Sequence, residues 1–178
     1  AFANTKGGRL LVGVKDNGKI AGVRSEEEIY MIEAAANMYC QPDVEIETIT
    51  HIVGGKTVLE VVIHEATIKP VCALDEENKP KAYIRIHDEN ILATLVHLKV
   101  WQQTKKKKGS FVTFTEREQH LMDILKEKGC LTLNQCCKAC RTSRPATCNL
   151  LADFIRFGLV TTHFEGHQFY FRLNEEQE

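Results

Sequence analysis

The sequence predicts an α+β fold in two domains, and three observations support this prediction. Residues 1–100 contain short apolar runs bounded by glycine, proline and asparagine, a pattern typical of a mixed sheet, together with one helical segment. Residues 115–178 contain three helical segments followed by a hairpin. Residues 101–114 hold four consecutive lysines followed by Gly-Ser, which indicates a solvated linker.

The composition is that of an ordinary globular protein, with 43% hydrophobic and 26% charged residues. The formal net charge is -1, so any binding of nucleic acid has to rest on local features. No apolar run approaches the ~18 residues of a membrane span, so we expect no membrane partner. Seven cysteines without a secretory signal predict a reducing cytoplasm. The chain starts at Ala1 rather than Met, and we expect it to be a fragment.

Strands and turns dominate the expected first domain. Apolar residues 10–14 predict a strand, and Asp16-Asn17-Gly18 predicts the tight turn that leads to residues 20–23. Ser25 and Glu28 have the spacing of a capping box, which predicts a helix that runs towards Pro42. The remaining strands are expected at residues 44–52, 58–63 and 82–87.

Helices dominate the expected second domain. Thr115 and Glu118 form another capping box, and Gly129 ends the helix that they begin. A short helix over 133–139 follows, and Ser143 and Pro145 then mark the start of a third helix. Residues 159–164 and 168–173 predict a hairpin. Three helices followed by a hairpin is the order of a winged helix-turn-helix, so we assign residues 115–178 to that fold.

The third helix is the expected reader of nucleic acid in this domain. At ~100° per residue, one side carries core residues, namely Ala146, Thr147, Leu150, Leu151, Phe154 and Phe157. The outward side is expected to carry Pro145, Cys148, Asn149, Ala152 and Arg156. Phosphates and base edges would be contacted by Arg141, Ser143, Arg144 and Asn149. The alternative is a winged helix that mediates homo-oligomerisation or partner binding.

The block Phe2-Ala3-Asn4-Thr5-Lys6-Gly7-Gly8-Arg9, continued to Gly22, resembles the Schlafen-like, Alba-type DNA-binding domain, also called a divergent AAA, ATP-binding domain. Lys69-Pro70 and residues 82–86 fit the end of that domain, so the resemblance covers residues 1–100. It implies an arrangement found in bacterial transcriptional regulators, in which this domain precedes a winged helix. Family members carry a further segment before the block, and this chain departs from them by lacking it.

Residues that offer hydrogen bonds or positive charge are the candidates for contacting phosphate. Gly7 and Gly8 permit a tight turn and close approach of a ligand, although a plain turn that needs glycine for its geometry explains them equally. The four linker lysines fit a flexible tether or a phosphate-contacting arm. The complete candidate set outside the third helix is Asn4, Thr5, Lys6, Gly7, Gly8, Arg9, Arg85, Lys105, Lys106, Lys107 and Lys108.

Asp16 is the one candidate for catalysis. The resemblance implies that three carboxylates bind a divalent metal in Schlafen-type RNases, with Asp16 as the third and its partners in the segment that this chain lacks. A plain Asp-Asn-Gly turn explains Asp16 without chemistry. We therefore expect no enzyme and no cofactor, and keep a metal-dependent nuclease as the alternative.

Two further motifs are set aside. Gly54-Gly55-Lys56-Thr57 ends like an ATP-binding Walker A loop, but Thr50 stands where that loop needs glycine and the segment joins two strands, which predicts a hairpin turn. An ATP or phosphate-ligand domain remains a further alternative.

Cys137 and Cys140 have the spacing of zinc ligands, but no second such pair follows, so we expect core thiols and no metal.

The sequence therefore predicts a cytoplasmic, bacterial, nucleic-acid-binding protein that regulates transcription, with DNA as the expected partner and RNA as the alternative.

Overall fold

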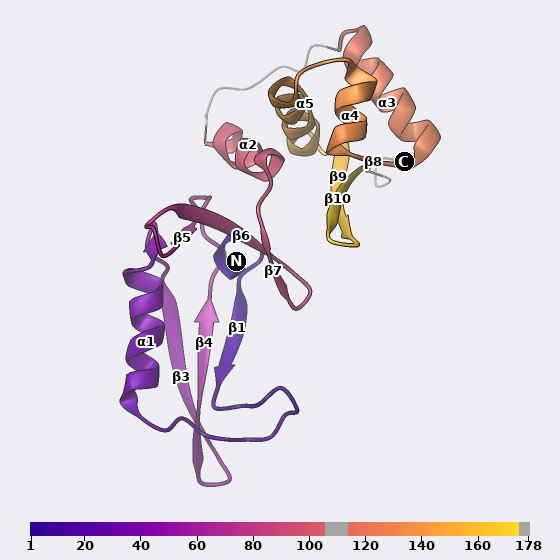
Figure 1. Ribbon diagram of the computed structural model, residues 1–178. Coiled ribbons are helices and arrows are strands. Elements are labelled where there is room, and N and C mark those ends of the chain that lie inside the picture. Colours follow the sequence, from indigo (N-terminus) through magenta and orange to yellow (C-terminus); the bar gives the residue numbers. More distant parts are fainter. Residues whose placement is uncertain (106–113, 175–178) are drawn as a thin grey trace. The chain divides into compact units, whose positions relative to one another are not determined.

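The computed structural model describes residues 1–105 and 114–174, and the chain forms two compact units, Ala1–Ala93 and Thr94–Glu178 (Figure 1). Helices and antiparallel strands occur together, so the predicted α+β class is confirmed. Among the helices that the structure describes, none has the length and apolar character needed to cross a membrane.

A three-stranded antiparallel sheet forms one part of the first unit. Its order is β1 (Gly8–Val12), β4 (Lys56–Ile63) and β3 (Ile46–Val53). The central strand β4 supplies the buried side chains Val58, Leu59 and Val61. Strands β3 and β4 are joined by the turn at Gly54-Gly55, which confirms the predicted hairpin. Helix α1 (Glu26–Asn37) follows the long loop after β1.

A four-stranded sheet forms the other part of the first unit. Its order is β2 (Cys40–Gln41), β5 (Cys72–Leu74), β6 (Pro80–Ile86) and β7 (Glu89–Leu92). The short 3-10 helix η1 (Phe2–Asn4) packs against β6. Residues 20–23, expected as a strand, contribute one isolated bridge between Val14 and Ile20, and the positive φ angles of Gly13 and Gly22 interrupt the extended chain there.

The second unit is helical with a small sheet. Its helices are α2 (Leu95–Thr104), α3 (Glu116–Lys128), α4 (Leu133–Cys140) and α5 (Arg144–Arg156). Its sheet has the order β8 (Cys130–Thr132), β10 (Gln168–Leu173) and β9 (Val160–Glu165). The fully buried Phe154 and Phe171 are the largest side chains of its core.

Local signals placed the helix starts well in this unit. The Thr115 N–H donates to the Glu118 carboxylate at 2.9 Å, which confirms the predicted contact of the capping box. The Ser143 hydroxyl accepts from the Ala146 N–H at 3.5 Å, with Pro145 in the first turn of α5. The expected hairpin is β9 and β10.

The boundary between the units differs from the expected one. The first unit ends at Ala93, and residues 101–104 lie in α2 rather than in a linker. The physical reason is packing, because α2 contacts α5 and its Val96 belongs to the buried cluster of the second unit. Two residues expected on the outward side of α5, Cys148 and Ala152, are consequently buried.

A partly buried histidine lies in α2. His97 stands three residues after the helix-capping Thr94, and its Nδ1 accepts a hydrogen bond from the Thr94 N–H at 3.2 Å. Its ring meets the ring of Phe169 edge-on at a centroid distance of 4.9 Å. Burial lowers the pKa of His97 from 6.5 to about 4.

This lowered pKa predicts a loss of stability in mild acid. Between pH 6.5 and about 4 the unfolded chain binds a proton at His97 that the folded chain does not, so the free energy of unfolding falls as the pH falls. The loss through this group approaches about 3 kcal/mol at the acid end. Urea unfolding measured across this pH range should show the free energy of unfolding falling with pH in the parent chain. The variant His97→Gln keeps a capping side chain that does not titrate, so its free energy of unfolding should depend less on pH. An equal pH dependence in the two proteins would contradict the assignment of this effect to His97.

Candidate nucleic-acid interface

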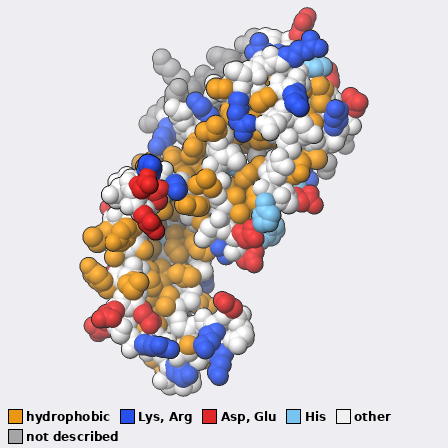
Figure 2. Space-filling view, in the orientation of Figure 1, with side chains coloured by type: hydrophobic (Ala, Val, Ile, Leu, Met, Phe, Trp, Pro, Cys, Tyr) orange, Lys and Arg blue, Asp and Glu red, His pale blue; other side chains and the backbone are white. Residues whose placement is uncertain are grey.

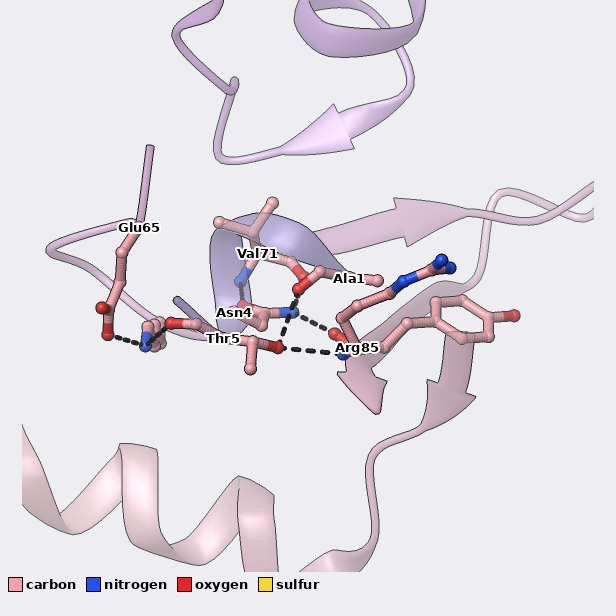
Figure 3. Close-up of polar contacts among 8 residues, drawn as sticks. Ala1, Asn4, Thr5, Glu65, Val71 and Arg85 are labelled. Atoms are coloured by element: carbon pink, nitrogen blue, oxygen red, sulfur yellow. Dashed lines mark hydrogen bonds and ion pairs between the residues drawn. The ribbon is translucent and has the colours of Figure 1, made fainter. Parts of the chain in front are cut away.

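Asn4 is a buried structural residue. Its side-chain amide donates to the carbonyl oxygens of Val71 at 2.7 Å and Tyr83 at 2.8 Å. Its Oδ1 accepts from the Val71 N–H at 2.8 Å (Figure 3). The residue is 4% exposed, so its amide is not available to phosphate. The expectation that Asn4 contacts a ligand is corrected: its side chain binds the main chain of two distant segments.

Thr5 and Arg85 extend this set of contacts. The Thr5 hydroxyl donates to the Ala1 carbonyl at 3.2 Å and accepts from the Arg85 N–H at 2.9 Å (Figure 3). The Arg85 guanidinium donates to Asn90 Oδ1 at 3.0 Å and lies over the ring of Phe2, 5.2 Å from its centroid. Both side chains therefore have partners within the first unit.

Gly7 and Gly8 are explained by packing. Gly7 has a φ of +72°, and a Cβ there would meet the Ile63 carbonyl oxygen at 2.5 Å. A Cβ on Gly8 would meet the ring of Phe2 at 2.3 Å. The structure thus favours the interpretation as a turn that needs glycine for its geometry over the interpretation as a ligand cradle.

Arg9 lies on β1 and pairs across the sheet. Its guanidinium is 3.0 Å from a Glu60 carboxylate oxygen, and His51 Nε2 lies 2.8 Å from the other oxygen. The hydrogen bond from His51, followed by the charge of Arg9, lowers the pKa of Glu60. Arg9 is nevertheless 73% exposed, and its neighbour Lys6 is exposed as well.

Asp16 is exposed in the loop between β1 and α1. The turn around it is held by Asn17, whose Oδ1 accepts from the Lys19 N–H at 3.1 Å. Within residues 1–105 and 114–174, no group of three or more histidine, cysteine or acidic side chains is arranged to hold a metal ion.

Three cysteines of the second unit lie in its core. Cys136, Cys140 and Cys148 are buried. Burial raises the pKa of all three thiols, that of Cys136 to about 12, so they stay protonated at neutral pH. The prediction of core thiols is confirmed for these three, whereas Cys137 is half-buried and Cys130 is exposed.

The linker lysines fall mainly beyond the described part of the chain. Lys105 is exposed and caps the C-terminus of α2. Lys106, Lys107 and Lys108 lie outside the described residues, so their contact with phosphate stays a prediction.

The start of α5 brings the remaining candidates together. Arg141 is exposed and ends α4 in the left-handed conformation, with a φ of 51°. Arg144 is exposed, and its guanidinium donates to Asn134 Oδ1 on α4 at 2.6 Å. Ser143 uses its hydroxyl as the helix cap, and Asn149 is exposed nearly two turns further along. Asn134 was not predicted, because no sequence spacing links it to Arg144.

The buried amide of Asn4 gives a testable prediction. Asn4→Ala leaves the main-chain groups of Val71 and Tyr83 without partners, so the first unit should lose about 2–4 kcal/mol of unfolding free energy. The control Asn17→Ala removes one exposed hydrogen bond and should cost under about 1 kcal/mol. Urea unfolding followed by circular dichroism measures both. A similar cost for the two variants would show that Asn4 is not the structural residue described here.

Comparison with known proteins gave one similar solved structure and one matching family model. The chain resembles the crystal structure of the DIP2311 protein from Corynebacterium diphtheriae at 15% identity and a TM-score of 0.45, over 98% of this chain and 38% of that one. The chain therefore spans well under half of that protein, and no curated protein matches it. The family model described as Schlafen, AlbA_2 matches residues 1–94, more than half of the sequence. The chain belongs to the Schlafen AlbA_2 family.

Proposed function

We propose that this protein binds nucleic acid, with DNA as its target, and that it acts as a transcriptional regulator. Membership of the Schlafen AlbA_2 family suggests a function related to nucleic acid and supports the first part. The second unit supports the choice of DNA, because the order α3, α4, α5 and then the hairpin β9–β10 is that of a winged helix-turn-helix. In that fold α5 is the helix that enters the major groove.

The observation that carries the proposal is the position of Arg144. Its side chain is exposed at the first turn of α5 while its guanidinium is bonded to Asn134 of the preceding helix. A guanidinium held in place loses less side-chain entropy when it binds, and its planar donors match phosphate or the edge of guanine. Arg144 is thus oriented before any ligand arrives.

The surroundings of Arg144 favour a negatively charged partner. Arg141 and the exposed Lys138 lie on the segment just before α5. Further along α5, Arg156 lies 3.5 Å from the carboxylate of Asp153. Positive charge is therefore concentrated at the N-terminal turn of α5, where the helix dipole also attracts phosphate.

The contribution of Arg144 can be measured on the full chain. Arg144→Ala should weaken binding to duplex DNA by about 1–3 kcal/mol and, if the guanidinium reads a base, relax the preference at one position of the site. Lys126→Ala removes one positive charge from the exposed end of α3 in the same unit and is the matched control, expected to change affinity by less than about 0.5 kcal/mol. Fluorescence anisotropy with labelled duplex measures both.

Three outcomes would count against the proposal. Absence of duplex binding by the parent chain at low salt would remove the DNA function. Binding of single-stranded RNA in preference to duplex would move the target to RNA. Equal affinities for Arg144→Ala and Lys126→Ala, with self-association of the parent chain, would make the second unit an assembly module.

A further inference from the structure

We propose that the first unit carries its own contact site for the sugar–phosphate backbone of nucleic acid. The site lies at the end of the three-stranded sheet where β1 ends and where the turn joins β3 to β4. We call this site the basic tip and define it by Lys15, Lys19 and Lys56. The inference rests on the proposed binding of nucleic acid and names a second surface that takes part in it. Lys15 and Lys19 were not among the candidate residues of the sequence, and Lys56 was considered there only in the motif that was set aside.

The basic tip is one structured surface made from two segments. Lys15 and Lys19 flank the turn after β1, and the Lys15 N–H donates to the Lys19 carbonyl at 3.0 Å. The Lys56 ammonium donates to the Ile20 carbonyl at 3.1 Å, which ties the β3–β4 turn to that loop. Figure 1 shows both segments at the same end of the sheet, and Figure 2 shows Lys and Arg side chains gathered there.

The charges of the basic tip are available to a ligand. Lys15, Lys19 and Lys56 are exposed, and none forms an ion pair with a described residue. Elsewhere in the first unit, Lys69, Lys79, Lys81 and Arg9 pair with carboxylates, whereas Lys6, Arg24 and Arg85 form no ion pair with a described residue. Asp16 is the acidic residue within the loop, and the three lysines outnumber it. The first unit has more acidic than basic residues, so three lysines without ion pairs give the basic tip a local positive charge that attracts anions.

The main chain at the basic tip is open to close approach. A Cβ built on Gly18, Gly54 or Gly55 would meet no other atom within 4 Å. A bulky, extended polyanion can therefore reach the peptide groups of both turns as well as the lysines. Such a polyanion is the backbone of nucleic acid, in keeping with the family of the chain.

An anionic membrane is the competing partner. Ile52 and Val53 are exposed beside the β3–β4 turn, and lysines next to exposed apolar side chains also suit a lipid surface. The test therefore includes vesicles that contain phosphatidylserine as a second arm.

The experiment compares two double variants of the full chain that lose the same charge from the same unit. Lys15→Gln/Lys19→Gln removes unpaired lysines of the basic tip, and Lys56 is left in place because it bonds Ile20. Lys79→Gln/Lys81→Gln removes lysines that are paired with Glu77 and Asp75 and is the control. Affinity for labelled duplex DNA and single-stranded RNA is measured across a salt series, and urea unfolding checks that both variants fold.

Each lysine that contacts a phosphate of duplex DNA contributes about -0.9 to the slope of log affinity against log salt. The variant of the basic tip should therefore bind more weakly than the parent chain and show a slope flatter by up to about 1.8, while the control keeps the parent's slope. If the parent binds and Arg144→Ala weakens it, but the two double variants behave alike, the basic tip is refuted and the proposed function stands. If the parent binds no nucleic acid, the proposed function is refuted, and the basic tip as a nucleic-acid contact is refuted with it. Binding to vesicles that is lost in the basic-tip variant, without a change in nucleic-acid binding, would reassign the surface to lipid.

Discussion

The first unit depends on one buried amide. The Asn4 side chain bonds to the main chain at Val71 and at Tyr83, and so holds the start of the chain against the four-stranded sheet. Strand β1 begins four residues later and pairs with β4 of the other sheet. The same short segment therefore joins both sheets. Because β1 ends at the loop that carries Lys15 and Lys19, the position of that loop is set by a hydrogen-bonded element at the opposite end of the strand.

The second unit exposes charge at one place by burying apolar surface at others. Cys148 and Ala152 of α5 are buried by the packing of α2 and the core. The first turn of α5 therefore remains its charged, accessible end. The bond between Arg144 and Asn134 then fixes how the guanidinium is presented. The burial of Cys148 and Ala152 and the orientation of the Arg144 guanidinium both follow from the way the helices of this unit pack.

Features with local causes could be predicted from the sequence. The capping contact of Glu118 with Thr115, the start of α5 at Ser143 and the Gly54-Gly55 turn depend on residues a few positions apart, and the structure contains all of them. The role of Asn4 could not be predicted, because its partners lie 67 and 79 residues away. The burial of Cys148 could not be predicted either: helical periodicity assumes one covered side, and α2 covers a second.

The packing of α2 determines where the second unit can be divided from the first. A fragment beginning at residue 115, as the sequence suggests, would lack Val96 and leave part of the apolar surface of α5 uncovered. Such a surface promotes association between copies, so the fragment would aggregate or dimerise for reasons unrelated to its role in the whole chain. A fragment beginning at Thr94 retains both the cover and the helix cap that starts it. The self-association of an isolated second unit is therefore informative only when α2 is included.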